Sequence, residues 1–514
     1  MHSRTIIRKN SYFDSVTLMS IGNEIKHMEG VEEAVVAMAT ELNQEILENV
    51  GLATDETRQA GPNDFVIAVM AASEDVCEAA VQAVDEKLNA KNNGASEREV
   101  SCATIKQALQ EMPDANVAVI SVPGRYAARE AMLALRQGLH VMLFSDNVSI
   151  EEERRLKEYA ASKGLLVMGP DCGTAAINGV GLCFANSVKK GPIGIVGASG
   201  TGLQEVMVQI DRLGGGVSQA IGTGGRDLKE DIGGIMMMQG IKALENDEDT
   251  KEIVLVSKPP AESVSRKIFE LLDTVSKPVV VCFLEGDMNM EHASHVHLCN
   301  TLYGAAEAAV AIAYPEAKVE DDVLTDELAQ KIEAARAALN PEQAYLRGFF
   351  CGGTLCAEAV FLLRNKLGAL KSNVSHKDGE EYAPTDTPVG TVLIDMGDDE
   401  FTNGRPHPMI EPALRNDKIV ECAEDPTVGV VLLDFEIGFG SHPDPAGQTI
   451  ESIVAARARA KELGRELAFV GYICGTDTDT QGLGAQTRAL EDAGVILARS
   501  NKEATEIAAS ILAR

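Results

Sequence analysis

Glycine-rich turns that follow apolar runs are the first places in this chain to look for chemistry. Small residues at such a turn leave backbone N–H groups exposed at the start of the next helix, where the helix dipole favours an anion. One turn follows residues 193–196, a second follows 348–350 and a third follows 430–435. We predict that these turns bind phosphate or another small anion, and the alternative is a plain capped turn. The predicted anion-binding residues are Ser199, Gly200, Thr201, Gly202, Gly352, Gly353, Thr354, Gly440 and Ser441.

Charged side chains in loops are the candidates for group transfer. Residues 404–408 place a guanidinium and an imidazole in one proline-flanked loop, where arginine can hold phosphate or carboxylate by a bidentate fork. A histidine can act as an acid, a base or a phosphoryl acceptor. Structural charge pairing or plain surface exposure is the alternative for each of these groups. The predicted catalytic residues are His407, Arg405, His442 and Lys258, and the predicted substrate-binding residues are Gly224, Gly225, Arg226 and Asp171.

No metal site is predicted. The ten cysteines show no Cys-x-x-Cys spacing, and the cluster of His292, His295 and His297 lacks a fourth ligand. The acidic run 395–399 could bind Mg²⁺, but a solvated turn is the stronger expectation. Scattered cysteines without a disulfide pattern indicate reduced thiols in a cytoplasmic protein, and we expect a buried, unreactive thiol at Cys172.

Alternating apolar and amphipathic segments must position these loops. Residues 116–122 and 140–144 read as buried strands, 127–137 and 151–162 as the helices after them, and 165–168 as a third strand. This β-α-β-α-β order predicts an α/β fold with a parallel sheet. Such sheets bind ligands at the carboxyl ends of their strands, which is where the candidate loops fall.

The first hundred residues are expected to form a small α+β region. Apolar residues at 6–7, 34–38 and 65–70 fit three strands around two helices, and the polar run 89–98 fits a loop. Further along, the charged stretch 318–338 reads as a helix within the main linker.

An internal repeat predicts two further α/β domains of similar topology. Residues 193–205 and 347–358 share a strand, a turn with Gly-Thr and a helix with an early glutamate. Three more pairs of strand-and-turn segments follow in the same order, which indicates a duplication. The expected regions are a small α+β part at 1–100, a first α/β domain at 101–190, a second at 191–315, a linker at 316–344 and a third at 345–514.

Composition argues against several classes of partner. The 514 residues carry a formal net charge of −32, which repels nucleic acid and anionic membranes. No run of about 18 apolar residues occurs, so no membrane span is predicted. Any small anionic substrate must therefore be held by a local site.

Several segments resemble known enzymes. Residues 116–262 resemble the α subunit of succinyl-CoA synthetase, and residues 438–444 and 475–476 resemble the ligase domain of its β subunit. From end to end, including residues 12–16 and 404–410, the chain is similar to the FdrA family of acyl-CoA-synthetase-like proteins. The segments that carry the α-subunit resemblance are Val122-Pro123, 168–173, 193–196, 199–201 and 222–225.

The resemblance implies a Rossmann-like CoA-binding-type domain at 101–190, followed by two flavodoxin-like ligase domains. In the synthetase, two helix N-termini face a phosphorylated histidine, and the matching helices would begin at 199–201 and near 440–441. This chain lacks the Gly-His-Ala-Gly-Ala loop of that histidine, and Lys258 stands near the place of the glutamate that supports it. It also carries no ATP-grasp domain, and its first hundred residues differ from the glycine-rich CoA loop.

Paired anion sites without an ATP-grasp domain favour phosphate-linked carbamoyl or acyl transfer. The FdrA resemblance implies an oxamate carbamoyltransferase of allantoin breakdown, which converts oxalurate and phosphate into oxamate and carbamoyl phosphate. The alternatives are an acyl-CoA ligase that acts with a separate ATP-grasp chain, and a non-catalytic CoA- or metabolite-binding scaffold. Phosphate or carbamoyl phosphate is the expected substrate, CoA binding stays open, and the expected partners are small anions and other subunits of a homo- or hetero-oligomer.

Overall fold

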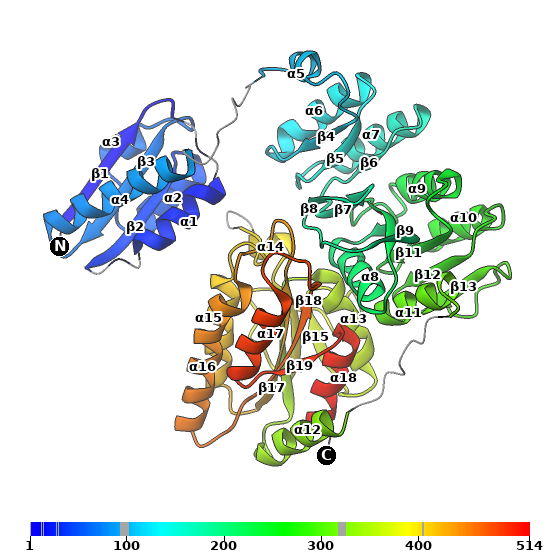
Figure 1. The fold of residues 1–514 in the computed structure, drawn as a ribbon. Helices are drawn as coiled ribbons and strands as arrows, with labels where there is room; N and C mark the ends of the chain where they lie inside the picture. The colour runs from blue at the N-terminus through cyan, green and yellow to red at the C-terminus, as the bar shows by residue number, and fades with distance from the viewer. Residues whose placement is uncertain are drawn as a thin grey trace. The chain divides into compact units, whose positions relative to one another are not determined.

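The computed structural model describes residues 2–11, 13, 15–26, 28, 30–92, 102–316, 325–402 and 406–513. The chain divides into two compact units, Met1–Ala103 and Thr104–Arg514. Each unit has its own sheets and helices (Figure 1).

The first unit is a three-stranded antiparallel sheet in the order β1-β3-β2. Alternate residues of its central strand pack into two separate apolar clusters, one on each face of the sheet. The three expected strands are confirmed. The elements of this unit are β1 (His2–Arg8), α1 (Ser15–Lys26), β2 (Val31–Met38), α2 (Glu41–Asn49), α3 (Asp55–Arg58), β3 (Phe65–Ala71) and α4 (Glu74–Asn92).

The helices of the first unit differ from the expectation. The described residues form four helices rather than two, and α4 continues through Asn92, into the run 89–98 that we expected to be a loop. The rest of that run lies outside the described residues. A polar stretch suits the last turns of a helix as well as a loop, so composition alone misplaced this boundary.

The second unit begins with a three-stranded parallel sheet in the order β4-β5-β6. The predicted β-α-β-α-β order is confirmed. Alanine and leucine residues of α6 form the face that packs against the sheet. The elements are α5 (Ile105–Glu111), β4 (Val117–Ile120), α6 (Gly124–Arg136), β5 (His140–Leu143), α7 (Ile150–Ser162) and β6 (Val167–Met168).

A seven-stranded sheet follows, in the order β13-β12-β11-β9-β10-β7-β8. Its first five strands are parallel, and the hairpin β7–β8 adds antiparallel strands at the edge of β10. The elements are β7 (Thr174–Ile177), β8 (Val180–Cys183), β9 (Lys190–Ala198), α8 (Gly200–Arg212), β10 (Val217–Gly222), α9 (Ile235–Asn246), β11 (Glu252–Ser257), α10 (Glu262–Leu272), β12 (Val279–Phe283), β13 (Val296–Cys299) and α11 (Leu302–Ala313).

The last sheet has six parallel strands in the order β15-β16-β14-β17-β18-β19. Five of its strands follow the order β16-β14-β17-β18-β19. They occupy the same relative places as β10, β9, β11, β12 and β13, as the internal repeat predicts. The elements are α12 (Asp326–Ala338), β14 (Tyr345–Phe350), α13 (Gly353–Arg364), β15 (Leu370–Ser372), β16 (Thr391–Asp395), α14 (Asp399–Thr402), α15 (Ala413–Glu421), β17 (Val428–Glu436), α16 (Pro445–Glu462), β18 (Ala468–Cys474), α17 (Leu483–Asp492), β19 (Ile496–Ala498) and α18 (Asn501–Leu512).

Two buried glutamates join these two larger sheets. Glu205 on α8 accepts the N–H of Asn501, the first residue of α18, at 3.4 Å. Glu358 on α13 accepts the N–H of Leu302, the first residue of α11, at 2.7 Å. Each glutamate therefore accepts an N–H from the first turn of a helix of the other half, beside that helix's own N-cap, Ser500 or Thr301. The early glutamates of the repeat thus have a structural role.

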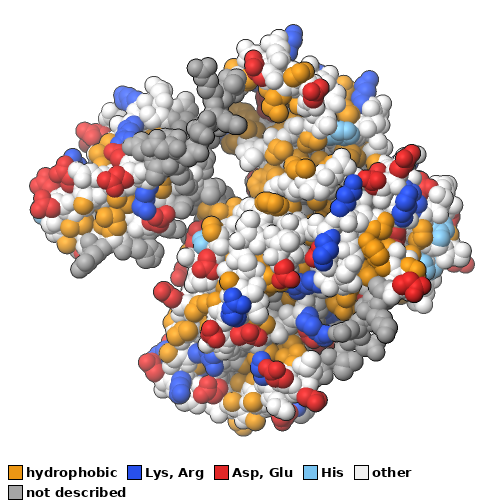
Figure 2. Space-filling view, viewed as in Figure 1, with side chains coloured by type: hydrophobic (Ala, Val, Ile, Leu, Met, Phe, Trp, Pro, Cys, Tyr) orange, Lys and Arg blue, Asp and Glu red, His pale blue; other side chains and the backbone are white. Residues whose placement is uncertain are grey.

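The surface carries charges of both signs. On the face drawn in Figure 2, Lys and Arg side chains of the described residues are interspersed with acidic ones over both units. No helix in the described part of the chain is both long and apolar enough to cross a bilayer.

Candidate functional site

The N-terminus of α8 lies beside a buried hydroxyl. Ser199 is the N-cap, and its hydroxyl accepts the Gly202 N–H at 3.0 Å. The amides of Gly200 and Thr201 precede any acceptor within the helix. Thr174 is 1% exposed, and its Oγ1 has no hydrogen-bond partner among the described residues. A Cβ built on Gly200 would lie 3.6 Å from that oxygen. An anion bound at this turn could therefore accept hydrogen bonds from the amides of Gly200 and Thr201 and from the Thr174 hydroxyl.

The second predicted turn is engaged by the protein's own carboxylates. The N–H groups of Cys351 and Gly352 donate to the two oxygens of Asp434 at 2.7 and 2.8 Å. The Asp395 carboxylate lies beside Gly353, where an added Cβ would be 2.3 Å from Oδ2. An external anion at the N-terminus of α13 would compete with both carboxylates, so the two turns are not equivalent.

The two turns meet where α8 and α13 pack together between the sheets (Figure 1). The hydroxyls of Ser199 and Thr354 are 2.6 Å apart, and the Thr354 N–H donates to Thr201 Oγ1 at 3.4 Å. A Cβ on Gly352 would lie 3.0 Å from the Thr201 side chain, so glycine permits this close approach. The structure thus brings the predicted residues 199–202 and 352–354 together.

Lys258 reaches the same region from the end of β11. A Cβ on Gly353 would lie 3.4 Å from Lys258 Nζ, so the ammonium group stands beside the Asp395 carboxyl. Asp395 is 7% exposed. Burial raises the pKa of Asp395 to about 7, although the positive charge of Lys258 opposes the shift. A carboxyl that titrates near neutral pH is suited to proton transfer.

Asp171 is solvent-accessible and has charged neighbours. Partial desolvation by the surrounding protein raises the pKa of Asp171 to about 7, and the carboxylates of Asp399 and Asp146 add to that shift. The positive charges of Arg226 and Lys258 oppose it. The structure therefore places the predicted residues Asp171, Arg226 and Lys258 within electrostatic reach of one another.

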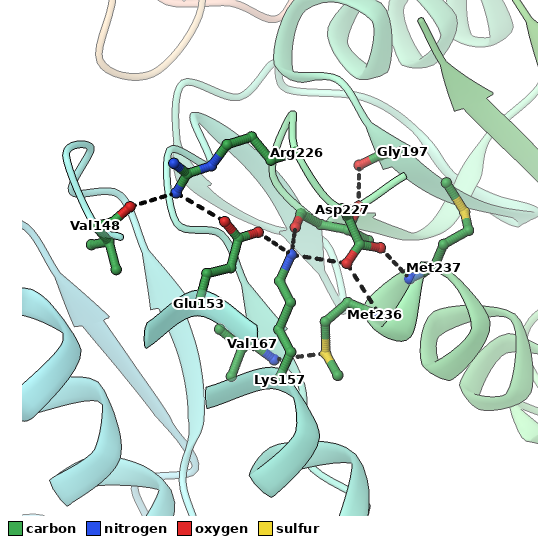
Figure 3. A network of polar contacts seen from close by, with 10 residues as sticks. Val148, Glu153, Lys157, Val167, Gly197, Arg226, Asp227, Met236 and Met237 are labelled. Carbon is green, nitrogen blue, oxygen red and sulfur yellow. Dashed lines mark hydrogen bonds and ion pairs between the residues drawn. The ribbon is translucent and has the colours of Figure 1, made fainter. Parts of the chain in front are cut away.

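Arg226 belongs to an ion-pair network at the end of β10 (Figure 3). Its Nη2 lies 2.9 Å from Glu153 Oε2 and donates to the Val148 carbonyl oxygen at 2.8 Å. Lys157, which is fully buried, donates to Glu153 Oε1 and Asp227 Oδ1, each at 2.8 Å. The network joins α7 to the loop after β10, so this loop is held in one position. Arg226 itself remains 31% exposed.

The two glycines of the loop after β10, Gly224 and Gly225, differ in how much space there is for a side chain. Gly224 has a φ of +85°, and an added Cβ would lie 2.5 Å from the Pro170 carbonyl oxygen. A side chain there would therefore displace the loop that carries Asp171. Gly225 is exposed, and nothing lies within 4 Å of its Cβ position.

His407 is half-buried against an aromatic ring. The ring centroids of His407 and Phe184 are 5.6 Å apart, and His407 Nδ1 accepts the Met409 N–H at 3.2 Å. Desolvation lowers the pKa of His407 to about 4, so the imidazole is neutral at pH 7. Arg405, predicted beside it, lies outside the described residues.

The third predicted turn forms a loop on the same aromatic ring. Asp444 is the N-cap of α16, and its N–H donates to His442 Nδ1 at 3.0 Å. Ser441, a predicted anion-binding residue, has a buried hydroxyl oxygen without a partner in the described part of the chain. A Cβ on Gly440 would lie 2.9 Å from the Phe184 ring. The loop is therefore placed by contacts to the segment after β8.

Sequence reasoning missed several groups. Asp395 was expected in a solvated turn, which is wrong, because it ends the buried strand β16. Asp434 and Glu436 were not singled out, although two charges at the end of an apolar run are unusual in a strand buried on both faces. Thr174 ends the turn 169–174 that also holds Asp171, but its hydroxyl was not singled out, and nothing in the sequence marked Phe184.

The Asp395 carboxyl should make stability depend on pH. Its pKa in the folded protein, about 7, is above the value of about 3.9 in an unfolded chain. The folded state then binds more protons between these values, so this group lowers the free energy of unfolding as pH rises. We expect the stability of the wild type relative to Asp395→Asn to fall by up to about 1.4 kcal/mol per pH unit from about pH 4 to pH 7.

Urea unfolding at several pH values measures this difference. Asparagine keeps an oxygen acceptor for the Gly397 N–H, which Asp395 now accepts at 2.9 Å. The control is Asp378→Asn, because Asp378 is exposed in the same half of the unit. A difference between wild type and Asp395→Asn that stays constant over this range would contradict the prediction.

Three family models match the chain in order. The first is the AllF, heavy metal-associated domain at residues 1–103, the second the CoA binding domain at 188–286, and the third the CoA-ligase at 349–511. The second match falls where we expected the first ligase domain. In the first unit, the Cys77 thiol is buried and donates to the His2 carbonyl oxygen at 3.4 Å.

The CoA binding domain and CoA-ligase matches define an acyl-CoA-synthetase-like protein. The chain is 48% identical to the uncharacterized protein YahF of Escherichia coli strain K12, over 98% of this chain and 97% of YahF. It therefore belongs to the FdrA family, the family of YahF-type proteins.

More distant similarities cover parts of the chain. Succinate–CoA ligase [ADP-forming] subunit alpha 2 of Archaeoglobus fulgidus is 29% identical, over 34% of this chain and 61% of that subunit. The structure of dinucleotide-forming acetyl-coenzyme A synthetase 1 of Ca. Korarchaeum cryptofilum, in complex with phosphate and ADP, aligns at 15% identity and a TM-score of 0.31. That alignment covers 81% of this chain and 86% of the other.

Proposed function

We propose that this protein is an enzyme subunit that transfers a carbamoyl or acyl group to or from phosphate at the N-terminus of α8. The observation that carries this proposal is the buried, unpaired hydroxyl of Thr174 beside the amides of Gly200 and Thr201. Phosphate oxygens accept hydrogen bonds from all three groups. Lys258, at the neighbouring strand end, supplies a positive charge.

The proposed reaction is of the oxamate carbamoyltransferase type, and membership of the FdrA family supports it. When carbamoyl phosphate is consumed, the amide nitrogen of oxamate attacks the carbamoyl carbon and forms a C–N bond. The C–O bond to phosphate breaks, phosphate leaves with the electron pair, and the nitrogen releases a proton. The α8 amides and Lys258 stabilise the departing phosphate, and Asp395, with a pKa of about 7, accepts the proton.

³¹P NMR of the purified chain tests this proposal. Oxamate and carbamoyl phosphate are supplied to the chain alone, and to the chain mixed with the proteins encoded beside it. We expect phosphate release that depends on oxamate, together with the formation of oxalurate. Phosphate release at the same rate without oxamate, or none in either mixture, would contradict carbamoyl transfer.

Thr174→Val should weaken phosphate binding. Valine keeps the shape of threonine but removes a hydrogen bond to a charged ligand, which contributes about 1.5–3 kcal/mol. We expect the Kd for phosphate to rise by about 10-fold or more, measured by isothermal titration calorimetry.

The matched control is Thr505→Val on α18. Thr505 is also buried, and its hydroxyl donates to the Asn501 carbonyl oxygen at 2.8 Å, so its loss tests the general effect of a missing buried hydroxyl. Equal phosphate affinities for wild type and Thr174→Val would remove Thr174 from the site.

An acyl-CoA ligase is the second candidate. The CoA binding domain and CoA-ligase matches favour it, as does the similarity to a succinate–CoA ligase α subunit. In that case this chain binds CoA and acts with a separate ATP-grasp chain. Calorimetric titration with CoA separates the two candidates, because tight CoA binding without oxamate-dependent phosphate release supports the ligase.

The same proposal implies particular substrates, partners and a cellular location. We propose small anionic substrates, a homo- or hetero-oligomer, and other subunits of one complex as partners. The alternative substrate is CoA, and no resident cofactor is proposed for the transfer. All ten cysteines are free thiols, which supports a reducing, cytoplasmic location.

A further inference from the structure

Three ligand-type side chains meet at the carboxyl ends of the adjacent strands β14 and β17. Cys351 Sγ and carboxylate oxygens of Asp434 and Glu436 all lie within 4.8 Å of one another. Cys351 is 3% exposed, Asp434 0% and Glu436 2%. In the described part of the chain, this is the group whose side chains could together hold a metal ion.

Glu436 is the least satisfied member of this group. Both of its carboxylate oxygens are buried, and neither has a hydrogen-bond partner among the described residues. A buried carboxyl without hydrogen bonds is costly, which points to a bound group that the protein atoms do not supply.

Arg415 supplies one positive charge but does not complete the site. Its Nη1 lies 2.8 Å from Cys351 Sγ and donates to the Asp434 carbonyl oxygen at 2.6 Å. The same nitrogen is 3.4 Å from Asp434 Oδ1. With Asp434, Glu436 and a Cys351 thiolate ionised, three negative charges would face one guanidinium. A divalent cation would bring this cluster to neutrality.

We propose that Cys351, Asp434 and Glu436 bind a divalent transition metal of the Zn²⁺ class. One sulfur and two carboxylate oxygens suit a borderline-soft ion, and three protein ligands leave a coordination position open. On binding, the Cys351 thiol and the Glu436 carboxyl each release a proton to solvent as their bonds to the metal form. Arg415, through its contact with Cys351 Sγ, then holds the thiolate in place. Asp434 can still accept the two amides, because each carboxylate oxygen has a second lone pair.

Co²⁺ is a spectroscopic probe for this site. The full-length protein, treated with a chelator and dialysed, is titrated with Co²⁺. We expect one equivalent to produce a thiolate-to-cobalt charge-transfer band, and Zn²⁺ to remove that band by displacement. The variants Cys351→Ser and Glu436→Gln should lose the band or bind Co²⁺ at least 10-fold more weakly.

The matched control is Cys356→Ser, in the first turn of α13. Cys356 is fully buried, and its Sγ lies 3.8 Å from Ser372 Oγ, outside the cluster. This variant should keep the band. A band that persists in Cys351→Ser would overturn the proposal, because it would come from another of the ten cysteines.

X-ray absorption spectroscopy of the Zn²⁺-loaded wild type tests the same site without any variant that could fail to fold. We expect one sulfur at about 2.3 Å and oxygen ligands at about 2.0–2.2 Å. A coordination shell without sulfur, or no retained zinc after dialysis, would overturn the proposal. None of these measurements uses the transfer reaction, so the metal site and the proposed function stand or fall separately.

Discussion

Replacing Lys157 by methionine is expected to lower the free energy of unfolding of the second unit by about 3–5 kcal/mol. Lys157 is fully buried, and its ammonium group lies 2.8 Å from carboxylate oxygens of both Glu153 and Asp227. It also donates to the Thr223 carbonyl oxygen at 2.9 Å. Methionine fills much of the same volume but leaves the carboxylates without this cation. Breaking a buried pair from one side is costly because the remaining charge cannot reach water.

Urea unfolding followed by circular dichroism measures this loss, because the chain has no tryptophan for fluorescence. The control is Arg154→Met on the same helix, whose exposed ion pair with Glu158 at 3.1 Å should contribute below about 0.5 kcal/mol. The double variant Lys157→Met with Asp227→Asn should regain part of the loss, because one unpaired charge is then removed. If Lys157→Met were as mild as Arg154→Met, the network would not be a buried ion pair in solution.

Lys258→Met is expected to reduce kcat of the proposed transfer by about 10²–10³-fold, the usual effect of removing one group that stabilises developing charge. The Lys258 ammonium group stands beside Gly353 and the Asp395 carboxyl, next to the meeting point of α8 and α13. Its charge would face the departing phosphate. Lys258→Arg should retain more activity than Lys258→Met, because it keeps the charge while changing its position.

The ³¹P NMR assay measures this loss directly. The matched control is Lys251→Met, because Lys251 is exposed and precedes β11 at the opposite end of the same strand. Wild-type turnover in Lys258→Met would exclude this lysine from the site. Equal losses in Lys251→Met and Lys258→Met would point to a general effect of charge on substrate approach.

Much of the fold could be predicted from local patterns. The strands at 117–120 and 140–143 and the helices after them follow from apolar runs and amphipathic periodicity, because their neighbours in the sheet are also neighbours in sequence. The internal repeat predicted two α/β domains of similar topology, and five strands of each larger sheet share one order. The edge hairpin β7–β8 was not predicted, since its pairing with β10 depends on a contact across the domain.

The candidate site was predicted less completely. The turns at 199–202 and 352–354 were found by their glycines, and the structure places them in contact. Whether their amides were free could not be read from the turns themselves. The Gly352 N–H donates a hydrogen bond to the carboxylate of Asp434, 82 positions further along the chain. The α8 turn instead lies beside the unpaired hydroxyl of Thr174.

The sequence by itself determined the α/β class, the duplicated halves and the turns that could bind an anion, because each depends on residues close together in the chain. Only the tertiary structure decided which charges are buried, as at Asp395, Lys157 and Glu436. Burial and pairing arise from segments that are distant in sequence but adjacent in space. For the same reason, the pKa of Asp395 near 7 and that of His407 near 4 could be assigned only once their surroundings were known.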